Sequence, residues 1–455
     1  MKLKKRNFLT SRVPCAVCRV PCHIRIYEIN LRYLQSKSKF CIKNKLLSFF
    51  RPLLLMKKGN VLFLIFFYLV CLTKASDYPL SSSSTISLLT CAKGERFFES
   101  YGHSAIRVKD TVNNADVVFN YGAFNSSENQ FYLDFLMGKP TFYLVIVPTA
   151  DFLKEYESEN RAVTASYLNL SIAQRQRIFD YLLWNADQQN YAYQYDFVYN
   201  NCATKINDIL IDQLSEDGIF SLPKIPVDEK YTLKEMLIQD IANHPLGSLG
   251  FYTILGVKLD KYPTTREWIF LPKNLKTALE KATLNGLPLV TKKNVIVRAF
   301  ENKNNSGDYS IKLILIITSI LPLATFLFRC KILNLFMSQA ILFLLGSLGL
   351  FLTCMCVFTN NDSTYWNWNL LWANPLFFVL LIVAKLKNLS VYKLGVGLLG
   401  VLLFFIIVFY YLFTHHLSIN YLLFLLTLGV YFSAFIFYDA LPKSVKTSQK
   451  TKKKA

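Results

Sequence analysis

Three side chains with the chemistry of a thiol enzyme occur in this sequence: Cys202, His103 and Asn120. A cysteine nucleophile needs a base that takes its proton and a third polar group that holds the base in the right tautomer. Cys202 supplies the nucleophile, His103 the base and Asn120 the orienting amide, with Asp196 as the reserve candidate for the orienting group. Two alternatives stay open on spacing alone. Cys202 would be a small buried residue near a hydrogen-bonded loop histidine, or it would form a disulfide with Cys91.

The residues around Cys202 predict that a helix begins there. Asn201 is a good N-cap residue. Cys202 would then lie in the first turn, where unpaired backbone N–H groups and the positive end of the helix favour a thiolate. The apolar residues that follow at helical spacing are Ile206, Ile209, Leu210 and Leu214.

A hairpin is predicted upstream, with His103 at its entrance. Residues 104–108 alternate as a half-buried strand does, and residues 117–121 form a second such strand. The turn between them falls at 113–114. Pairing of the two strands would bring Asn120 beside His103.

Other motifs in the chain are weaker than this constellation. The stretch 395–400 fits the glycine pattern of dinucleotide-binding loops, but it lies inside an apolar run and has no strand before it. Cys15, Cys18, Cys22 and His23 have a spacing similar to that of zinc ligands, without a second complete ligand pair. We therefore expect neither a metal nor a cofactor.

The composition indicates a membrane protein. Of 455 residues, 53% are hydrophobic and only 18% are charged, which is unlike a soluble protein. The formal charge of +21 is concentrated at the two ends. Residues 1–58 carry fifteen Lys and Arg against one acid, and the segment from Lys443 carries six Lys, which leaves +1 for everything between. A nucleic-acid surface needs basic residues spread over a folded face, so DNA and RNA are not expected partners.

The second half of the sequence contains five apolar runs near the length of a membrane span, about 20 residues. Basic residues follow every second boundary: Arg329 after the first run, Lys385 after the third, and the Lys-rich tail after the fifth. By the positive-inside rule these connections are cytoplasmic, so the preceding domain and the loop 359–369 lie on the outer side. The five runs are 313–328, 335–358, 370–384, 394–413 and 419–438.

These signals divide the chain into five segments. Residues 56–75 have the basic start, apolar centre and small-residue cleavage site of a signal peptide. Residues 1–55 would be a mis-assigned upstream extension. The exported Cys/His domain follows at 76–308, the five-helix transmembrane domain at 309–442, and a basic cytoplasmic tail at 443–455.

Six motifs of the exported domain resemble the periplasmic domain of Lnb-type lipoprotein N-acyltransferases in order and spacing. The likeness covers about residues 85–285, and the membrane half is similar too at 369–376. In that family a histidine is expected in the loop just before this last motif, where the present chain reads Thr359-Asn360-Asn361-Asp362. The six motifs lie at 88–91, 101–108, 119–122, 159–161, 196–204 and 270–272.

The resemblance implies a fold. The exported part would be an α+β domain of the permuted papain-like type, similar to NlpC and lecithin-retinol-acyltransferase enzymes, in which the histidine precedes the cysteine. Those acyltransferases usually have a second histidine where Asn120 stands here. An all-α five-helix transmembrane domain would follow it.

The resemblance also implies a reaction at the outer side of the bacterial inner membrane. Cys202 would take a fatty acyl group from the diacylglyceryl ester of a lipoprotein, forming a thioester. The amine of the lipoprotein's amino-terminal cysteine would then accept the acyl group, which leaves a lyso-form product. Backbone N–H groups at the start of the Cys202 helix would bind the oxyanion. The partners would be lipid-anchored lipoproteins and membrane phospholipid.

Two other classes of function stay open. One is a membrane-anchored thiol amidase or peptidase acting on the cell wall, and the other is a non-catalytic membrane sensor. A lipid substrate has to be met at the bilayer, whereas a wall hydrolase needs no polytopic anchor, so the apolar runs favour acyl transfer. Likeness of fold does not by itself fix the chemistry.

Overall fold

The computed structural model describes most of the chain between residues 78 and 432. The predicted signal peptide at 56–75, the apolar run at 313–328 and the tail at 443–455 lie outside the described residues, as do most of the extension at 1–55 and most of the run at 419–438. The described residues are 13–14, 21–22, 78–125, 129–224, 231–300, 331–359, 362–386, 389–414, 425–426 and 428–432.

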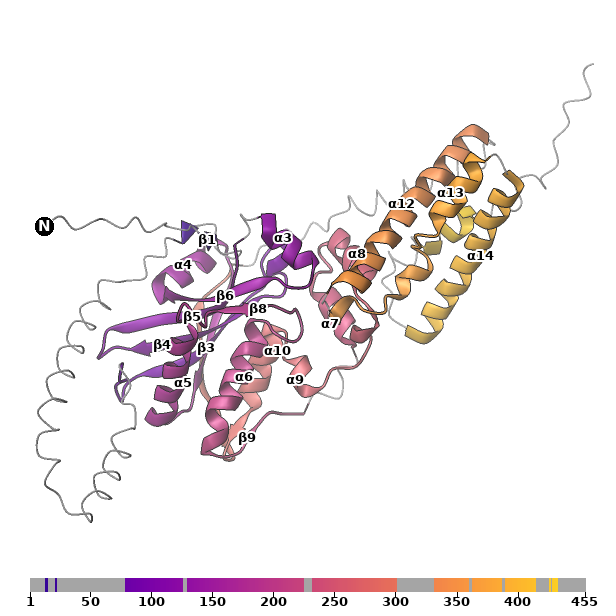
Figure 1. The fold of residues 1–455 in the computed structure, drawn as a ribbon. Helices are drawn as coiled ribbons and strands as arrows, with labels where there is room; N and C mark the ends of the chain where they lie inside the picture. The colour runs from indigo at the N-terminus through magenta and orange to yellow at the C-terminus, as the bar shows by residue number, and fades with distance from the viewer. Residues whose placement is uncertain are drawn as a thin grey trace, which may run out of the picture.

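A seven-stranded antiparallel sheet is the centre of the first domain (Figure 1). Its strands run in the order β12-β7-β3-β4-β5-β6-β8. Consecutive residues of β3 and β4 are buried, and because successive side chains point to opposite faces, both faces of the sheet are covered. The strands are β3 Thr85–Cys91, β4 His103–Asp110, β5 Ala115–Ala123, β6 Thr141–Pro148, β7 Val163–Leu168, β8 Ala192–Gln194 and β12 Val290–Val297.

Helices cover both faces of the sheet (Figure 1). Helix α4 packs Phe152 and Tyr156 against one face, while α5, α6 and α10 build the larger core on the other face. The predicted α+β domain is thus confirmed. The helices are α3 Asn129–Leu136, α4 Thr149–Ser158, α5 Ile172–Asn185, α6 Cys202–Leu214, α7 Leu233–Asp240, α8 Pro245–Ile254, α9 Thr265–Trp268 and α10 Pro272–Lys281.

Short elements complete the described part of the chain. The small strands are β1 Val13–Pro14, β2 Pro21–Cys22, β9 Phe220–Ser221, β10 Thr283–Leu284 and β11 Leu287–Pro288. The 3-10 helices are η2 Phe97–Glu99, η3 Ser215–Asp217, η4 Val257–Leu259, η5 Asp362–Thr364 and η6 Trp368–Leu371.

The predicted hairpin upstream of the cysteine is present as β4 and β5. The turn between the strands occupies residues 111–114, and Asn114 has a φ of 51°, a left-handed conformation that asparagine tolerates. Ladder pairing begins at Ile106 with Phe119. The strands therefore diverge ahead of Ile106, at the end where His103 lies.

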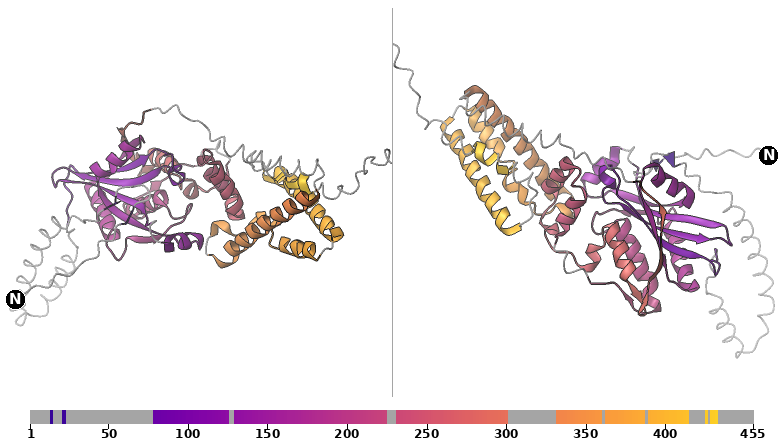
Figure 2. Two further views of the ribbon diagram at one scale, coloured as in Figure 1. Left: turned by 90° about the horizontal axis from the view of Figure 1, so that it is seen from above. Right: turned by 180° about the vertical axis from the view of Figure 1, so that it is seen from behind.

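Apolar helices follow the sheet domain: α12 Lys331–Phe358, α13 Phe377–Lys385 and α14 Leu389–Thr414. Both views of Figure 2 show them packed together beyond α7 and α8. Within the described part of the chain, one helix, Leu335–Phe358, is long and apolar enough to cross a membrane, and Ser390–Leu403 is a shorter apolar helix. The predicted run 370–384 begins inside η6, and its α-helical part belongs to the nine-residue α13, Phe377–Lys385. Five spans thus remain a prediction, and a membrane-associated helical part is what the described residues support.

Helix α8 joins the two parts. Its last carbonyl groups have no partner inside the helix, and two asparagines of the membrane part supply donors. Asn367 Nδ2 donates to Thr253 O (2.7 Å) and Ile254 O (2.9 Å), while Asn369 Nδ2 donates to Tyr252 O (2.8 Å) and Thr253 O (3.0 Å). The sheet domain is thereby held against the membrane part at one defined place.

Candidate active site

Cys202 is the first residue of α6, as the sequence predicts. The side-chain oxygen of Asn201 accepts hydrogen bonds from the backbone N–H groups of Ala203 (2.9 Å) and Thr204 (3.0 Å). Thr204 Oγ1 accepts a hydrogen bond from the Asn201 N–H (2.8 Å), which completes a capping box. Two of the N–H groups expected to bind an oxyanion are therefore already used to cap the helix.

The thiol of Cys202 lies against the start of β4. Burial raises the pKa of the Cys202 thiol to about 11, although hydrogen bonds from the backbone N–H groups of Ser104, Ala203 and Cys202 lower it. The helix end thus acts in the predicted direction, but desolvation outweighs it. The Cys202 side chain is itself only partly buried, and a thiolate at this position stays a prediction.

His103 is the first residue of β4, and the glycine before it fixes its position. Gly102 has a φ of +73°, and a Cβ at this position would lie 2.6 Å from Cys91 O, so only glycine fits. His103 Nε2 lies 2.6 Å from Asn120 Oδ1. Because that oxygen can only accept, Nε2 carries the ring proton and Nδ1 keeps a free lone pair, as a general base requires.

Of the two candidates for the orienting group, Asn120 is the one that contacts His103, whereas Asp196 lies in the turn before α6. The Asp196 carboxylate accepts hydrogen bonds of 2.8 and 2.7 Å from two backbone N–H groups in the turn before α6. Gly122, at φ +109°, follows Asn120 where the pairing of β5 with β6 shifts register. A Cβ on Gly122 would lie 3.6 Å from His103 Cε1, so the hairpin encloses the ring closely. Both His103 and Asn120 are buried, with exposed fractions of 6% and 3%.

Asn120→Ala is expected to lower the rate of acyl-enzyme formation at Cys202 by about 10- to 100-fold, as loss of a group that orients a functional histidine does elsewhere. The reason is loss of the hydrogen bond that fixes the tautomer and the plane of the ring. The burst rate with an activated ester, measured on purified protein, gives the number. If Asn120→Ala keeps the wild-type burst rate while His103→Ala loses it in the same assay, the amide has no orienting role.

His103 is held in its neutral form. Burial lowers the pKa of His103 to about 4; the hydrogen bond to Asn120 opposes this shift, and the charge of Arg161 adds to it. Arg161 is fixed nearby by donating to Ala92 O (3.0 Å) and to the Glu159 carboxylate (2.8 Å). Both pKa shifts favour a thiol and a neutral imidazole over an ion pair at neutral pH.

The rate of alkylation of Cys202 by iodoacetamide is expected to rise about tenfold per pH unit from pH 7 towards a plateau near pH 11, because only the thiolate reacts. His103, with a pKa of about 4, carries no charge that would stabilise the thiolate over this range. Mass spectrometry of the Cys202 peptide measures the rate at this one cysteine. A plateau already reached near pH 6 would reveal a thiolate–imidazolium pair and contradict the neutral site.

Cys91 lies next to the site without belonging to it. It is paired directly opposite His103 across β3 and β4, and burial raises its thiol pKa to about 12. Cys91 and Cys202 are both free thiols, so the disulfide alternative is not realised. A buried thiol of this kind is inert.

Tyr193 is a residue of the site that the sequence analysis did not single out. Its hydroxyl is buried and has no hydrogen-bond partner among the described residues. Its ring lies 5.1 Å from Lys205 Nζ, and Lys205 follows Cys202 by one turn of α6. Burial raises the pKa of Tyr193, and the charge of a Cys202 thiolate raises it further. Tyrosines alternate at Tyr191, Tyr193 and Tyr195, just before the cysteine motif. This period of two is the strand signal that could have singled out Tyr193 in the sequence.

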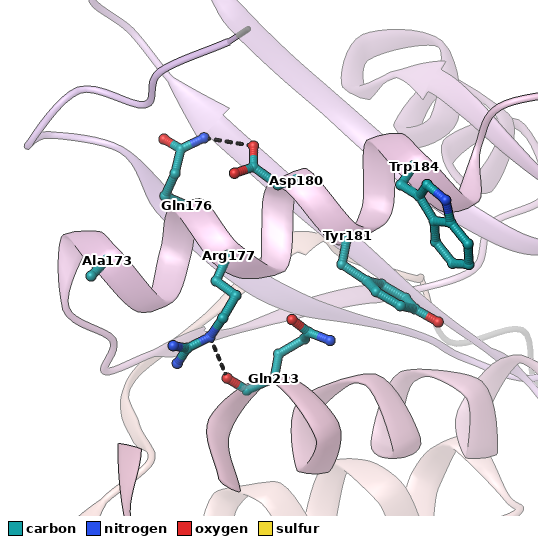
Figure 3. A pocket seen from close by; sticks show the side chains of 7 residues that line it. All are labelled: Ala173, Gln176, Arg177, Asp180, Tyr181, Trp184 and Gln213. Carbon is teal, nitrogen blue, oxygen red and sulfur yellow. Dashed lines mark hydrogen bonds between the residues drawn. The ribbon is translucent and has the colours of Figure 1, made fainter. Parts of the chain in front are cut away.

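A separate surface pocket of about 590 Å³ lies between α5 and α6 (Figure 3). Tyr181 and Trp184 form its apolar side, and Arg177 donates a hydrogen bond to Gln213 O (2.7 Å). Gln213 lies near the opposite end of α6 from Cys202, so this pocket is not the thiol site. The described residues contain no cluster of three or more His, Cys, Asp or Glu side chains that would hold a metal ion.

The fold and the site define a class of protein. Its members have a sheet domain joined to apolar helices, and the sheet domain carries a thiol at a helix start and a buried imidazole–amide pair. Residues 75–231, which include all three predicted site residues, match the family model described as the Lnb N-terminal periplasmic domain. The match supports an Lnb-type family assignment, and with it a membrane-associated protein that has a periplasmic domain. The chain matches no curated protein and no solved structure.

Proposed function

We propose that this protein is a lipoprotein N-acyltransferase that works through a thioester on Cys202. The observation that carries the proposal is the convergence of three groups on the start of β4. These are the capped helix-start thiol of Cys202, the His103 ring, and the Asn120 amide that leaves Nδ1 of that ring free. The Lnb-type assignment and the adjoining apolar helices support a substrate held in a membrane.

The first half-reaction acylates the enzyme. His103 Nδ1 takes the thiol proton as the Cys202 sulfur attacks the ester carbonyl of the diacylglyceryl group. Collapse of the tetrahedral intermediate breaks the bond to the glyceryl oxygen, and His103 returns the proton to that oxygen. The products are a thioester on Cys202 and a lyso-glyceryl alcohol. Within the described residues, no hydrogen bond joins the Cys202 thiol to the His103 ring. The sulfur and the ring nitrogen therefore have to approach each other as substrate binds.

The second half-reaction transfers the acyl group. The amine of the lipoprotein's amino-terminal cysteine attacks the thioester, and His103 Nδ1 takes a proton from the attacking nitrogen. Collapse of the second intermediate breaks the carbon–sulfur bond, and the proton returns to the sulfur. An amide has replaced an ester, and the thiol is regenerated.

Tyr193 is the proposed donor to the oxyanion of both intermediates. The Asn201 cap already uses the N–H groups of Ala203 and Thr204. The Tyr193 hydroxyl is buried and has no hydrogen-bond partner among the described residues, and the Tyr193 ring contacts Lys205 Nζ of α6 (5.1 Å to the ring centroid). A preorganised donor of this kind stabilises charge as it develops and costs no reorganisation.

The proposal includes the setting of the reaction. The sheet domain would have the permuted papain-like fold and lie on the periplasmic side of the inner membrane, and the five apolar runs would cross that membrane. The contact of α8 with Asn367 and Asn369 supports an arrangement in which the thiol faces lipid at the membrane surface. Lipid-anchored lipoproteins and membrane phospholipid are the proposed partners.

Mass spectrometry of a lipoprotein amino terminus tests the proposal. A diacylated lipopeptide incubated with the purified full chain should lose one ester-linked acyl group and gain an amide-linked one, with no change in total acyl mass. Release of free fatty acid, or cleavage of peptidoglycan fragments with no change in the lipopeptide, would replace acyl transfer with thiol hydrolysis.

A further inference from the structure

Five aromatic side chains form a closed circle of ring contacts near the thiol. Neighbouring centroids lie 5.4 to 6.5 Å apart, and every contact is edge-to-face. The rings come from η2, α3, the segment before α6, and α8. We call them the five-ring circle; in order around it they are Phe97, Phe98, Phe135, Phe197 and Phe251.

The five-ring circle is not part of a closed core. Each of its members keeps some exposed surface, and Phe98 is 56% exposed, whereas the core phenylalanines Phe119 and Phe270 are almost fully buried. Leu133, on the same helix as Phe135, is also 56% exposed. Exposed apolar groups that adjoin one another mark a binding surface more often than they occur without function.

One side of the circle leads to Cys202. The ring of Tyr195 lies 5.4 Å from that of Phe197, in an edge-to-face contact. The side-chain amide of Asn201, the residue before Cys202, donates a hydrogen bond to Phe197 O (2.7 Å), so the segment that carries Phe197 lies beside the start of α6. An acyl group on the Cys202 sulfur would therefore start close to this segment and meet the circle at Phe197.

The other side of the circle leads to the membrane part through α8. Phe251 belongs to the circle, while Leu249 and Tyr252 of the same helix pack against the core of the apolar helices. Phe97 lies so close to α8 that a Cβ on Gly247 would clash with its ring. Helix α8 thus contacts both the five-ring circle and the core of the apolar helices.

We propose that the five-ring circle binds the fatty acyl chain of the donor ester and guides it from the lipid to Cys202. The proposal rests on the proposed function and names the substrate feature that the same site recognises. A saturated chain has no polar group, and the five rings of the circle are apolar; the polar ring of His244 contacts Phe97 edge-to-face at 5.7 Å. The chain-binding energy of the circle acts far from the reacting carbonyl, so it should lower KM for long chains more than it raises kcat.

The test compares a short and a long acyl ester on the purified full chain. The probes are p-nitrophenyl butyrate and p-nitrophenyl palmitate in mixed micelles, with the p-nitrophenol burst as readout. Phe98→Ala should raise KM for palmitate by about tenfold, since a large apolar contact is removed, while kcat changes little. Both constants for butyrate should stay within about twofold. Trp184→Ala is the matched control, because Trp184 is 57% exposed but lies on α5 at the separate pocket.

Two results would overturn the proposal: equal effects of Phe98→Ala on both esters, or the same palmitate defect in Trp184→Ala. A labelled palmitoyl chain identifies the donor of the acyl group. Cys202 should take up label from a diacylated lipopeptide. Uptake of label from phospholipid alone would contradict the choice of donor. The lipopeptide assay of the unaltered protein reports separately on the proposed function. If the unaltered protein transfers no acyl group to the lipopeptide but still prefers long p-nitrophenyl esters, the N-acyl transfer proposal is rejected. The proposed acyl-chain site at the five-ring circle then still holds.

Discussion

Cys202→Ala is expected to reduce acyl transfer to the uncatalysed level, a loss of roughly 10⁴-fold or more, as removal of a covalent nucleophile typically causes. Alanine replaces a small side chain at a capped helix start, and the capping bonds of Asn201 do not involve the thiol. Folding and membrane insertion should therefore be nearly unchanged. The readouts are lipopeptide mass spectrometry and trapping of a thioester-linked fatty acid on the protein.

His103→Ala should have a comparable effect, and the double variant Cys202→Ala with His103→Ala should be little worse than either alone, because residues that act as one unit are not additive. Cys91→Ala is the control, since it removes a buried thiol that takes no part in the proposed steps. N-acylated lyso product made at the normal rate by Cys202→Ala would reject the thiol mechanism.

Tyr193→Phe is expected to lower kcat by about 10²- to 10³-fold, the usual result of removing one oxyanion donor. The change removes only a hydroxyl, and that hydroxyl has no hydrogen-bond partner within the described residues, so stability should not fall. KM should be nearly constant, because the hydrogen bond forms only in the transition state. Single-turnover kinetics with an activated ester separate the two constants.

Tyr101→Phe provides a matched comparison for Tyr193→Phe. Its hydroxyl is likewise buried and unpartnered among the described residues, but the charge that raises the pKa of Tyr101, beyond the effect of burial, comes from Asp240 and not from Cys202. Activity of Tyr101→Phe should stay near that of the unaltered protein. Equal losses in both variants would mean that the Tyr193 hydroxyl acts through packing rather than on the oxyanion.

Local sequence predicted the parts of the site that depend on neighbours in the chain. The N-cap at Asn201 and the helix that follows it come from capping chemistry and apolar spacing over a few residues. The hairpin that joins His103 to Asn120 follows from alternation and from a turn at Asn114. Each of these signals lies within about twenty residues, so no knowledge of the tertiary fold is needed to find it.

The features that the sequence did not predict depend on tertiary packing. The helix end favours a thiolate at Cys202, but the amount of burial that reverses this effect is decided by strands and loops elsewhere in the chain. Tyr193 becomes a candidate donor only because its hydroxyl is buried beside α6 without a partner in the described part of the chain. The five-ring circle joins residues up to 154 positions apart, from Phe97 to Phe251, which no local pattern can indicate.

The asparagine contacts at the end of α8 fix the sheet domain against the apolar helices, and under the proposed function they would set the distance of the thiol from the lipid. A domain on a flexible tether would sample many distances from the lipid, and its reaction rate would depend on how often it reached the right one. Here Asn367 and Asn369 each donate two hydrogen bonds to α8, so the distance is a property of the fold. Under the proposed function, such a protein would select an ester by its depth along the bilayer normal. The polypeptide beyond the lipidated cysteine would then be free to vary, and the proposed enzyme would process lipoproteins of unrelated sequence.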